Sequence, residues 1–125
     1  MARSLLGSSY RYGGETPSGF DCSGFARYVF EEDGLYLPRT ASEQAEAGRW
    51  VPLDELDEGD LVFFSEVGSK PHHVGIVVSQ AGEPLRMIHA STSRGVVETD
   101  ILVGTYWLRR LRFGRRIDEP RTSAR

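Results

Sequence analysis

The sequence predicts an α+β fold in which a helix near the N-terminus packs on one face of an antiparallel sheet. Two patterns support this prediction. Apolar residues at positions 22, 25, 26, 29 and 30 follow helical spacing. Downstream, five segments rich in β-branched, aliphatic and aromatic residues alternate with stretches rich in turn residues. Because the helical segments come first and the strand segments follow, we expect helix and sheet to form separate layers.

The first predicted helix runs from about Cys22 to Glu32. A loop rich in Gly and Pro precedes it, and Asp21 is a suitable N-cap because its carboxylate can accept a hydrogen bond from a free backbone N–H. A second short helix is expected to follow the run 37–40 and to extend to Gly48. Thr40 is its expected cap, and no chemistry is assigned to Arg39.

Side chains alternate between the two faces of each expected strand, so the adjacent residues His72 and His73 should point to opposite faces. Gly75 should share the face of His73, and its missing side chain should let the helix that carries Cys22 approach closely. The expected strands are 60–64, 73–78, 86–91, 96–101 and 106–113.

Length and charge restrict the class of protein. The 125 residues suit one domain, expected over 1–117, with a polar tail over 118–125. The net charge of -3 excludes a strong overall attraction to nucleic acid or to an anionic membrane. No apolar run approaches the ~20 residues that span a bilayer. No signal peptide is visible in the printed residues, and a single cysteine cannot form an internal disulfide.

Arginine is concentrated at the C-terminal end, where seven of the 15 basic residues lie within the last 17 positions. We expect this end to alternate as a strand with a solvated face. The sharper alternative is that it binds anionic wall polymers or phospholipid.

Cys22, the only cysteine, is the first candidate for chemistry. In the first turn of a helix, unpaired N–H groups and the helix dipole favour a thiolate, so the pKa of Cys22 should be lowered. The N–H of Cys22 and that of a neighbour could also face a developing oxyanion. The alternative is a small core residue. The Gly-rich loop and the polar neighbours Asp21 and Ser23 favour an open helix entrance instead.

A cysteine hydrolase also needs a base, usually a histidine that a third polar group orients. If strands 73–78 and 86–91 pair through a hairpin, His89 can lie beside His73. His73 would then be the general base, and His89 would orient it by accepting a hydrogen bond from its ring. We expect His72 to be a solvated loop residue.

Six motifs in order resemble the NlpC/P60 family of bacterial cell-wall cysteine peptidases. The resemblance covers the chain from about Leu5 to Ile117 and implies a permuted papain-like fold with a five- or six-stranded antiparallel sheet. The motifs are Tyr10-Arg-Tyr-Gly-Gly, Gly19-Phe-Asp-Cys-Ser-Gly-Phe, Leu37-Pro-Arg-Thr, Gly59-Asp-Leu-Val-Phe-Phe, His73-Val-Gly-Ile-Val and Ile88-His-Ala-Ser-Thr.

The resemblance also implies an activity, which is hydrolysis of the bond between D-γ-glutamate and a diamino acid in peptidoglycan stem peptides. It makes Cys22 the nucleophile, His73 the base and His89 the third member of the triad. It further implies that the Tyr10 hydroxyl faces the oxyanion and that Asp21 and Ser23 grip the amino group of an N-terminal L-alanine.

From the same resemblance we expect a secreted, periplasmic or wall-associated monomer without a cofactor, whose partner is peptidoglycan or a muropeptide. The diamino acid could be diaminopimelate or lysine.

Three other functions are compatible with parts of the pattern. A zinc module could use Cys22, His73 and His89, although the spacing lacks CxxC or HxxxH. An inactive wall-binding or phage-tail domain would need no reactive thiol. An amidase or acyltransferase of the same fold would share the nucleophile and the base.

Overall fold

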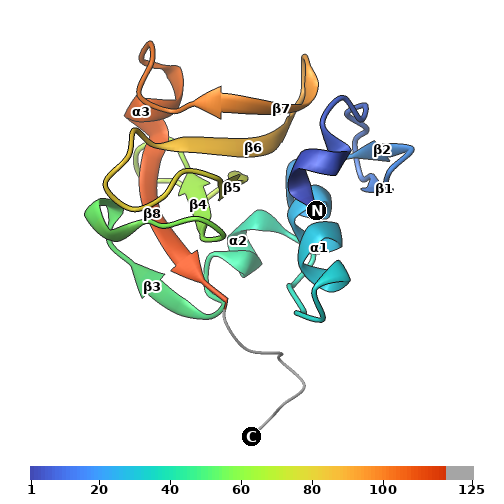
Figure 1. Ribbon diagram of the computed structural model, residues 1–125, viewed down its shortest axis with the longest axis horizontal. Helices are drawn as coiled ribbons and strands as arrows, with labels where there is room; N and C mark the ends of the chain where they lie inside the picture. Colours follow the sequence, from blue (N-terminus) through green and yellow to red (C-terminus); the bar gives the residue numbers. More distant parts are fainter. Residues whose placement is uncertain (118–125) are drawn as a thin grey trace, which may run out of the picture.

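The structure is a computed structural model that describes residues 1–117, so the tail expected over 118–125 lies outside the described residues. Helix α1 lies to one side of a six-stranded sheet, with the N-terminal segment beside it (Figure 1). The predicted α+β class is therefore confirmed. In chain order the elements are η1 (Ala2–Leu5), β1 (Glu15–Thr16), β2 (Gly19–Phe20), α1 (Cys22–Glu32), α2 (Ala41–Gln44), β3 (Arg49–Val51), η2 (Leu53–Glu55), β4 (Leu61–Phe64), β5 (His73–Val77), β6 (Arg86–Ser91), β7 (Gly95–Asp100), α3 (Tyr106–Arg110) and β8 (Leu111–Arg116).

The sheet has the order β3-β8-β4-β5-β6-β7, and all its neighbouring strands are antiparallel. Strands β4 to β7 form the expected meander, and β8 returns to pair with the free side of β4. Edge strand β3 was not predicted. It has only three residues, of which the first two are exposed, too few for a period-two pattern to be visible.

Helix α1 has the predicted bounds. The Asp21 carboxylate accepts a hydrogen bond from the Gly24 N–H at 2.7 Å and caps the helix. Helix α2 begins as predicted at Thr40, which forms a capping box with Glu43. It ends earlier than predicted, after Gln44, because the Ala47 N–H bonds to the Gln44 carbonyl in a tighter turn that leads to Gly48 at φ +64°.

The prediction of a strand over 106–113 is wrong in its first half, where α3 forms instead. Strand β4 ends at Phe64, whose partner on β8 is Leu111, so residues before Leu111 have no strand to pair with. They satisfy their backbone locally, as in the bond from the Arg109 N–H to the Thr105 carbonyl at 3.0 Å.

Two apolar clusters cover the two faces of the sheet. Alternate residues of β5 and β6 enter each cluster, as the period of two requires. The cluster under α1 includes Phe25, Ala26, Val29, Phe30, Val74, Ile76, Ile88 and Ala90. The cluster on the opposite face includes Val51, Leu56, Val62, Phe64, Val77, Met87 and Ile101, with Trp107 packed against it.

Candidate active site

Cys22 is held at the start of α1 by a close approach of two backbone segments. The Asp21 N–H donates to the carbonyl of Gly14 at 3.0 Å, which fixes the preceding loop against the first helical turn. A side chain at Gly24 would collide with that same carbonyl oxygen. The glycines of the loop and of the helix start therefore allow a contact that determines where the Cys22 side chain emerges.

The sulfur of Cys22 lies against the edge of β5, at a point where β5 and β6 are no longer paired. The pairs between these strands are Ile76 with Ile88 and Val77 with Met87. Helix α1 contacts both strands, and the Cys22 thiol is directed at the His72 carbonyl at 3.7 Å. The helix start thus reaches the histidine-bearing face through the opening between two diverging strands.

The role predicted for Gly75 is wrong. Gly75 and His73 do share a face, but it is the face opposite the α1 core. A side chain at Gly75 would collide with the sulfur of Met87 rather than with α1. The glycine therefore accommodates Met87, and the divergence of β5 from β6 gives the helix its access.

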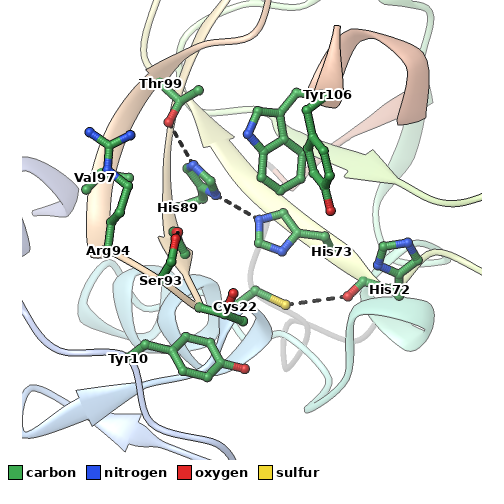
Figure 2. A pocket seen from close by; sticks show the side chains of 13 residues that line it. Tyr10, Cys22, His72, His73, His89, Ser93, Arg94, Val97, Thr99 and Tyr106 are labelled. Atoms are coloured by element: carbon green, nitrogen blue, oxygen red, sulfur yellow. Dashed lines mark hydrogen bonds between the residues drawn. The ribbon is translucent and has the colours of Figure 1, made fainter.

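A chain of three hydrogen-bonding side chains runs across the sheet from this opening (Figure 2). His73 Nε2 lies 2.8 Å from His89 Nδ1, and His89 Nε2 lies 2.8 Å from the Thr99 hydroxyl oxygen. If the Thr99 hydroxyl accepts from His89, then His89 Nδ1 accepts from His73, and the Nδ1 of His73 keeps a lone pair. In Figure 2 that side of the His73 ring faces the sulfur of Cys22.

Trp107 holds both histidine rings from the side. Its ring centroid lies 4.6 Å from that of His73 and 5.0 Å from that of His89. Trp107 also packs on Phe64, so the tryptophan joins the histidines to the apolar cluster on that face. This packing removes water from the rings and restricts their rotation.

Burial determines the protonation of the site. It lowers the pKa of His73 to about 3, with the neighbouring His89 adding to the effect, and lowers the pKa of His89 to about 4. The prediction of a lowered thiol pKa is wrong, because burial raises the pKa of Cys22 more than the N–H groups of Val74, Ser23 and Cys22 itself lower it. Near neutral pH the resting site therefore holds a neutral thiol and neutral imidazoles.

Cys22, His73 and His89 open onto a cavity of about 460 Å³. Tyr10 also lines it and is held there by a bridge to Phe20, while burial raises the pKa of its hydroxyl. His72 lies at the rim with 47% of its side chain exposed, in agreement with the loop position expected for it. The other lining residues are Ser91, Thr92, Ser93, Arg94, Val97, Thr99, Tyr106 and Trp107.

Asp21 and Ser23 are not among the residues that line this cavity. The Arg39 guanidinium donates to both carboxylate oxygens of Asp21, at 3.1 and 2.8 Å, and to the Ser23 hydroxyl at 2.9 Å. Arg39, to which the sequence assigned no chemistry, therefore occupies the groups expected to grip a substrate amine.

Sequence reasoning missed Thr99, Trp107 and Arg94. A signal for Thr99 was available, since a tight turn at 91–95 puts Val97 opposite His89 and Thr99 opposite Met87, on the histidine face. No signal for Trp107 existed while its segment was expected to be a strand.

As far as Arg116, the arginine-rich end is more internally paired than predicted. Arg116 donates twice to Asp60, each time at 2.7 Å, and the Asp60 side chain is only 2% exposed. Arg110 pairs with Glu66 at 2.7 Å, and Arg115 donates to the carbonyl of Ala45 at 2.6 Å. Because these cations have partners within the fold, they offer less free charge to an external polymer than the sequence implied.

Two further properties concern residues 1–117. No three histidine, cysteine, aspartate or glutamate side chains in this range cluster so that they could hold a metal ion, which counts against the zinc alternative. No helix in this range has the length and apolar character needed to cross a bilayer.

A cysteine at a helix start beside a histidine that a second polar side chain orients is the arrangement of a cysteine hydrolase. A model of the NlpC/P60 family matches residues 7–116, and the chain belongs to this family. The fold comparison agrees, since an NlpC/P60 family protein from Bacillus cereus superimposes with a TM-score of 0.84 at 29% identity, over 93% of this chain and 37% of that one.

Two relatives of named activity are similar in sequence. The murein DD-endopeptidase MepS/murein LD-carboxypeptidase of Escherichia coli is 43% identical over 89% of this chain and 56% of its own length. The γ-D-glutamyl-L-lysine dipeptidyl-peptidase of Bacillus subtilis is 39% identical over 86% of this chain and 36% of its own length. The chain thus spans about half the length, or less, of these relatives.

Proposed function

We propose that this protein is a cysteine peptidase that hydrolyses the bond between D-γ-glutamate and the diamino acid of peptidoglycan stem peptides. The observation that supports it most directly is the 2.8 Å contact between His73 and His89, with the free side of His73 turned toward Cys22 (Figure 2). A merely structural cysteine would need no such neighbour.

The neutral resting site defines the order of the chemical steps. The Cys22 thiol transfers its proton to His73 Nδ1 as the sulfur attacks the carbonyl carbon. His89 stabilises the imidazolium through the bond to His73 Nε2. The imidazolium then protonates the leaving amine, the C–N bond breaks, and a thioester remains on Cys22. Water, deprotonated by His73, releases the γ-glutamyl acid.

The oxyanion can be stabilised by groups from two sides. The N–H groups of Cys22 and Ser23 act on the pKa of the Cys22 thiol, so they lie close to the sulfur and are candidate oxyanion donors. The Tyr10 hydroxyl approaches the cavity from the loop before β1 (Figure 2). Tyr10→Phe should therefore lower kcat without preventing the reaction.

Fewer observations support the identity of the bond than support the type of reaction. The Bacillus relative is named for a γ-D-glutamyl bond, which supports the proposal, whereas the Escherichia relative is named for DD and LD bonds. The substrate also suggests where the protein acts, because peptidoglycan lies outside the cytoplasm; we propose secreted, periplasmic or wall-associated action.

Digestion of defined muropeptides, with mass spectrometry of the fragments, tests the proposal. The expected result is cleavage after D-γ-glutamate by the wild-type protein and none by Cys22→Ala. Cleavage only at a DD or LD bond would show that the proposed bond is wrong, but the protein would still be a cysteine peptidase. Release of the stem from the sugar would indicate an amidase, and transfer of the acyl group to an added amine an acyltransferase. Full cleavage by Cys22→Ala would overturn the mechanism.

A further inference from the structure

The cavity that holds Cys22 is lined by one arginine and by no acidic side chain of the described residues. Among residues 1–117, Arg94 is the only lysine or arginine that lines the cavity, and no aspartate or glutamate lines it. Burial lowers the pKa of both His73 and His89, so these two histidines add no charge near neutral pH. His72, at the rim, lies 3.9 Å from the Glu66 carboxylate. The cavity therefore attracts anions and disfavours cations.

Within the described residues, Arg94 has a free guanidinium at the cavity, whereas several arginines elsewhere in the fold are neutralised by carboxylates. Arg39, Arg110 and Arg116 each pair with an acid. In the part of the chain that the structure describes, no acidic side chain pairs with the guanidinium of Arg94, and its charge helps to lower the pKa of His89. An exposed guanidinium beside a cavity can use its planar donors to bind a carboxylate from outside.

The turn that carries Arg94 is held in place by the N-terminal segment. The Val96 N–H donates to the Ser8 carbonyl and the Gly7 N–H donates to the Val96 carbonyl, both at 2.9 Å. Gly95 adopts φ +76°, and a side chain there would collide with the Ser8 carbonyl. The backbone from which Arg94 projects is thus fixed before substrate arrives, which reduces the part of the ordering cost that falls on the turn.

Hydroxyl groups accompany the guanidinium. Ser91, Thr92 and Ser93 line the same part of the cavity, and the oxygens of Ser91 and Ser93 lie 3.4 Å apart. Figure 2 shows Ser93 and Arg94 on the same side of the cavity as His89 and Thr99, with Tyr106 opposite. A cation with adjacent hydroxyl donors suits a carboxylate better than a neutral amide.

We propose that Arg94 is a specificity-determining residue that binds a free carboxylate of the stem peptide next to the bond under attack. This inference rests on the proposed function. Two carboxylates of such a substrate meet the description, namely the α-carboxylate of D-glutamate and the second carboxylate of diaminopimelate. Amidation removes the first, and lysine in place of diaminopimelate removes the second.

Four synthetic stem peptides separate the two sources. They combine D-glutamate or D-isoglutamine with diaminopimelate or lysine, and kcat and KM are measured for wild type, Arg94→Gln and Arg94→Lys. Arg109→Gln is the matched control, because Arg109 is exposed on α3 and does not line the cavity. It removes the same charge from the molecule without touching the site.

Arg94→Gln is expected to lower kcat/KM by about 10- to 100-fold, mostly through KM, on peptides that carry the recognised carboxylate. On peptides that lack it, the effect should stay below about threefold, as should that of Arg109→Gln on all four. Arg94→Lys should keep part of the affinity because it keeps the charge but not the planar fork. An equal loss on all four peptides, or none on any, overturns the proposal.

A binding measurement keeps this test separate from the proposed reaction. Affinities of the same four peptides for the Cys22→Ala protein, with and without Arg94→Gln, require no turnover. If wild type cleaves none of the peptides, the proposed function fails, while carboxylate-dependent binding that is lost with Arg94→Gln still supports the site. If the affinity depends neither on the carboxylate nor on Arg94, the proposed carboxylate site is wrong.

Discussion

The two sides of the first turn of α1 use polar groups in opposite ways. On one side, Asp21 and Ser23 face Arg39 in an ionic cluster whose carboxylate oxygens both accept from the guanidinium. On the other side, Cys22 faces neutral histidines that are buried beside Trp107. Three consecutive residues thus belong to two clusters. Asp21 and Ser23 enter an ion-paired, structural cluster, and Cys22 enters an uncharged, reactive one.

The difference shows how a reactive group can be kept in a stable fold. The carboxylate of Asp21 is fully used in capping the helix and binding Arg39, so it does not act as a counter-ion in the cavity. With no anion lining the cavity within the described chain, burial keeps the histidines unprotonated and able to accept the thiol proton. The ionic cluster positions the helix start, and the neutral cluster is available for chemistry.

The largest effect should follow from removing the base on the reactive side. We expect His73→Gln to lower kcat/KM on a muropeptide by about 10⁴-fold, because the thiol then has no acceptor for its proton. Thermal unfolding should change little. The matched control is His72→Gln, next in the chain but at the rim, which should change kcat/KM less than about threefold. Similar losses in the two variants would contradict the assignment.

A smaller effect should follow from removing the last member of the hydrogen-bond chain. Thr99→Val leaves His89 Nε2 without its partner, so the tautomer that keeps a lone pair on His73 is no longer favoured. We expect kcat to fall about tenfold, the value of one hydrogen bond, with KM unchanged. Thr99→Ser keeps the hydroxyl and should restore kcat. If serine fails to do so, Thr99 has only a packing role.

On the ionic side the effect should appear in stability more than in catalysis. Arg39→Ala removes both bonds to Asp21, and we expect the free energy of unfolding in urea to fall by about 1–2 kcal/mol. The loss in kcat/KM should be less than about tenfold, since the cluster only positions the helix start. Arg39→Lys cannot reproduce the two-point contact and should recover part of the stability. A loss in kcat/KM as large as that of His73→Gln would show that the two sides are not separate.

The smallest expected effect concerns the neutral histidines His73 and His89 and is seen in the pH dependence of stability. The pKa values of His73 and His89 are lowered on folding to about 3 and about 4, so the unfolded chain binds more protons below about pH 6.5. Their contribution to stability is present above that pH and is lost as the pH falls toward 3. Urea unfolding between pH 7 and 4.5 should show this decline, and His89→Gln should reduce its slope. If His89→Gln leaves the slope unchanged, protonation of the buried histidines is not what destabilises the protein at low pH.

Much of the architecture could be predicted because it depends on local patterns. Asp21 before a helically spaced apolar run marks the start of α1, and the alternation along 73–78 separates His73 from His72. His89 lies beside His73 as expected from strands joined by a hairpin, although the pairing of β5 with β6 stops before it reaches the histidines. The segment of α3 could not be predicted this way, because its conformation depends on where β4 ends.

By itself, the sequence determined the family and the residues that stand at the helix start and on the histidine strands, since turn chemistry and periodicity are properties of neighbouring residues. Only the tertiary structure decided what surrounds them. It joined Asp21 to Arg39, placed Trp107 against the histidines, and brought Arg94 to the cavity without an acidic partner among residues 1–117. It also raised rather than lowered the pKa of Cys22, because burial depends on distant segments that close over the sulfur.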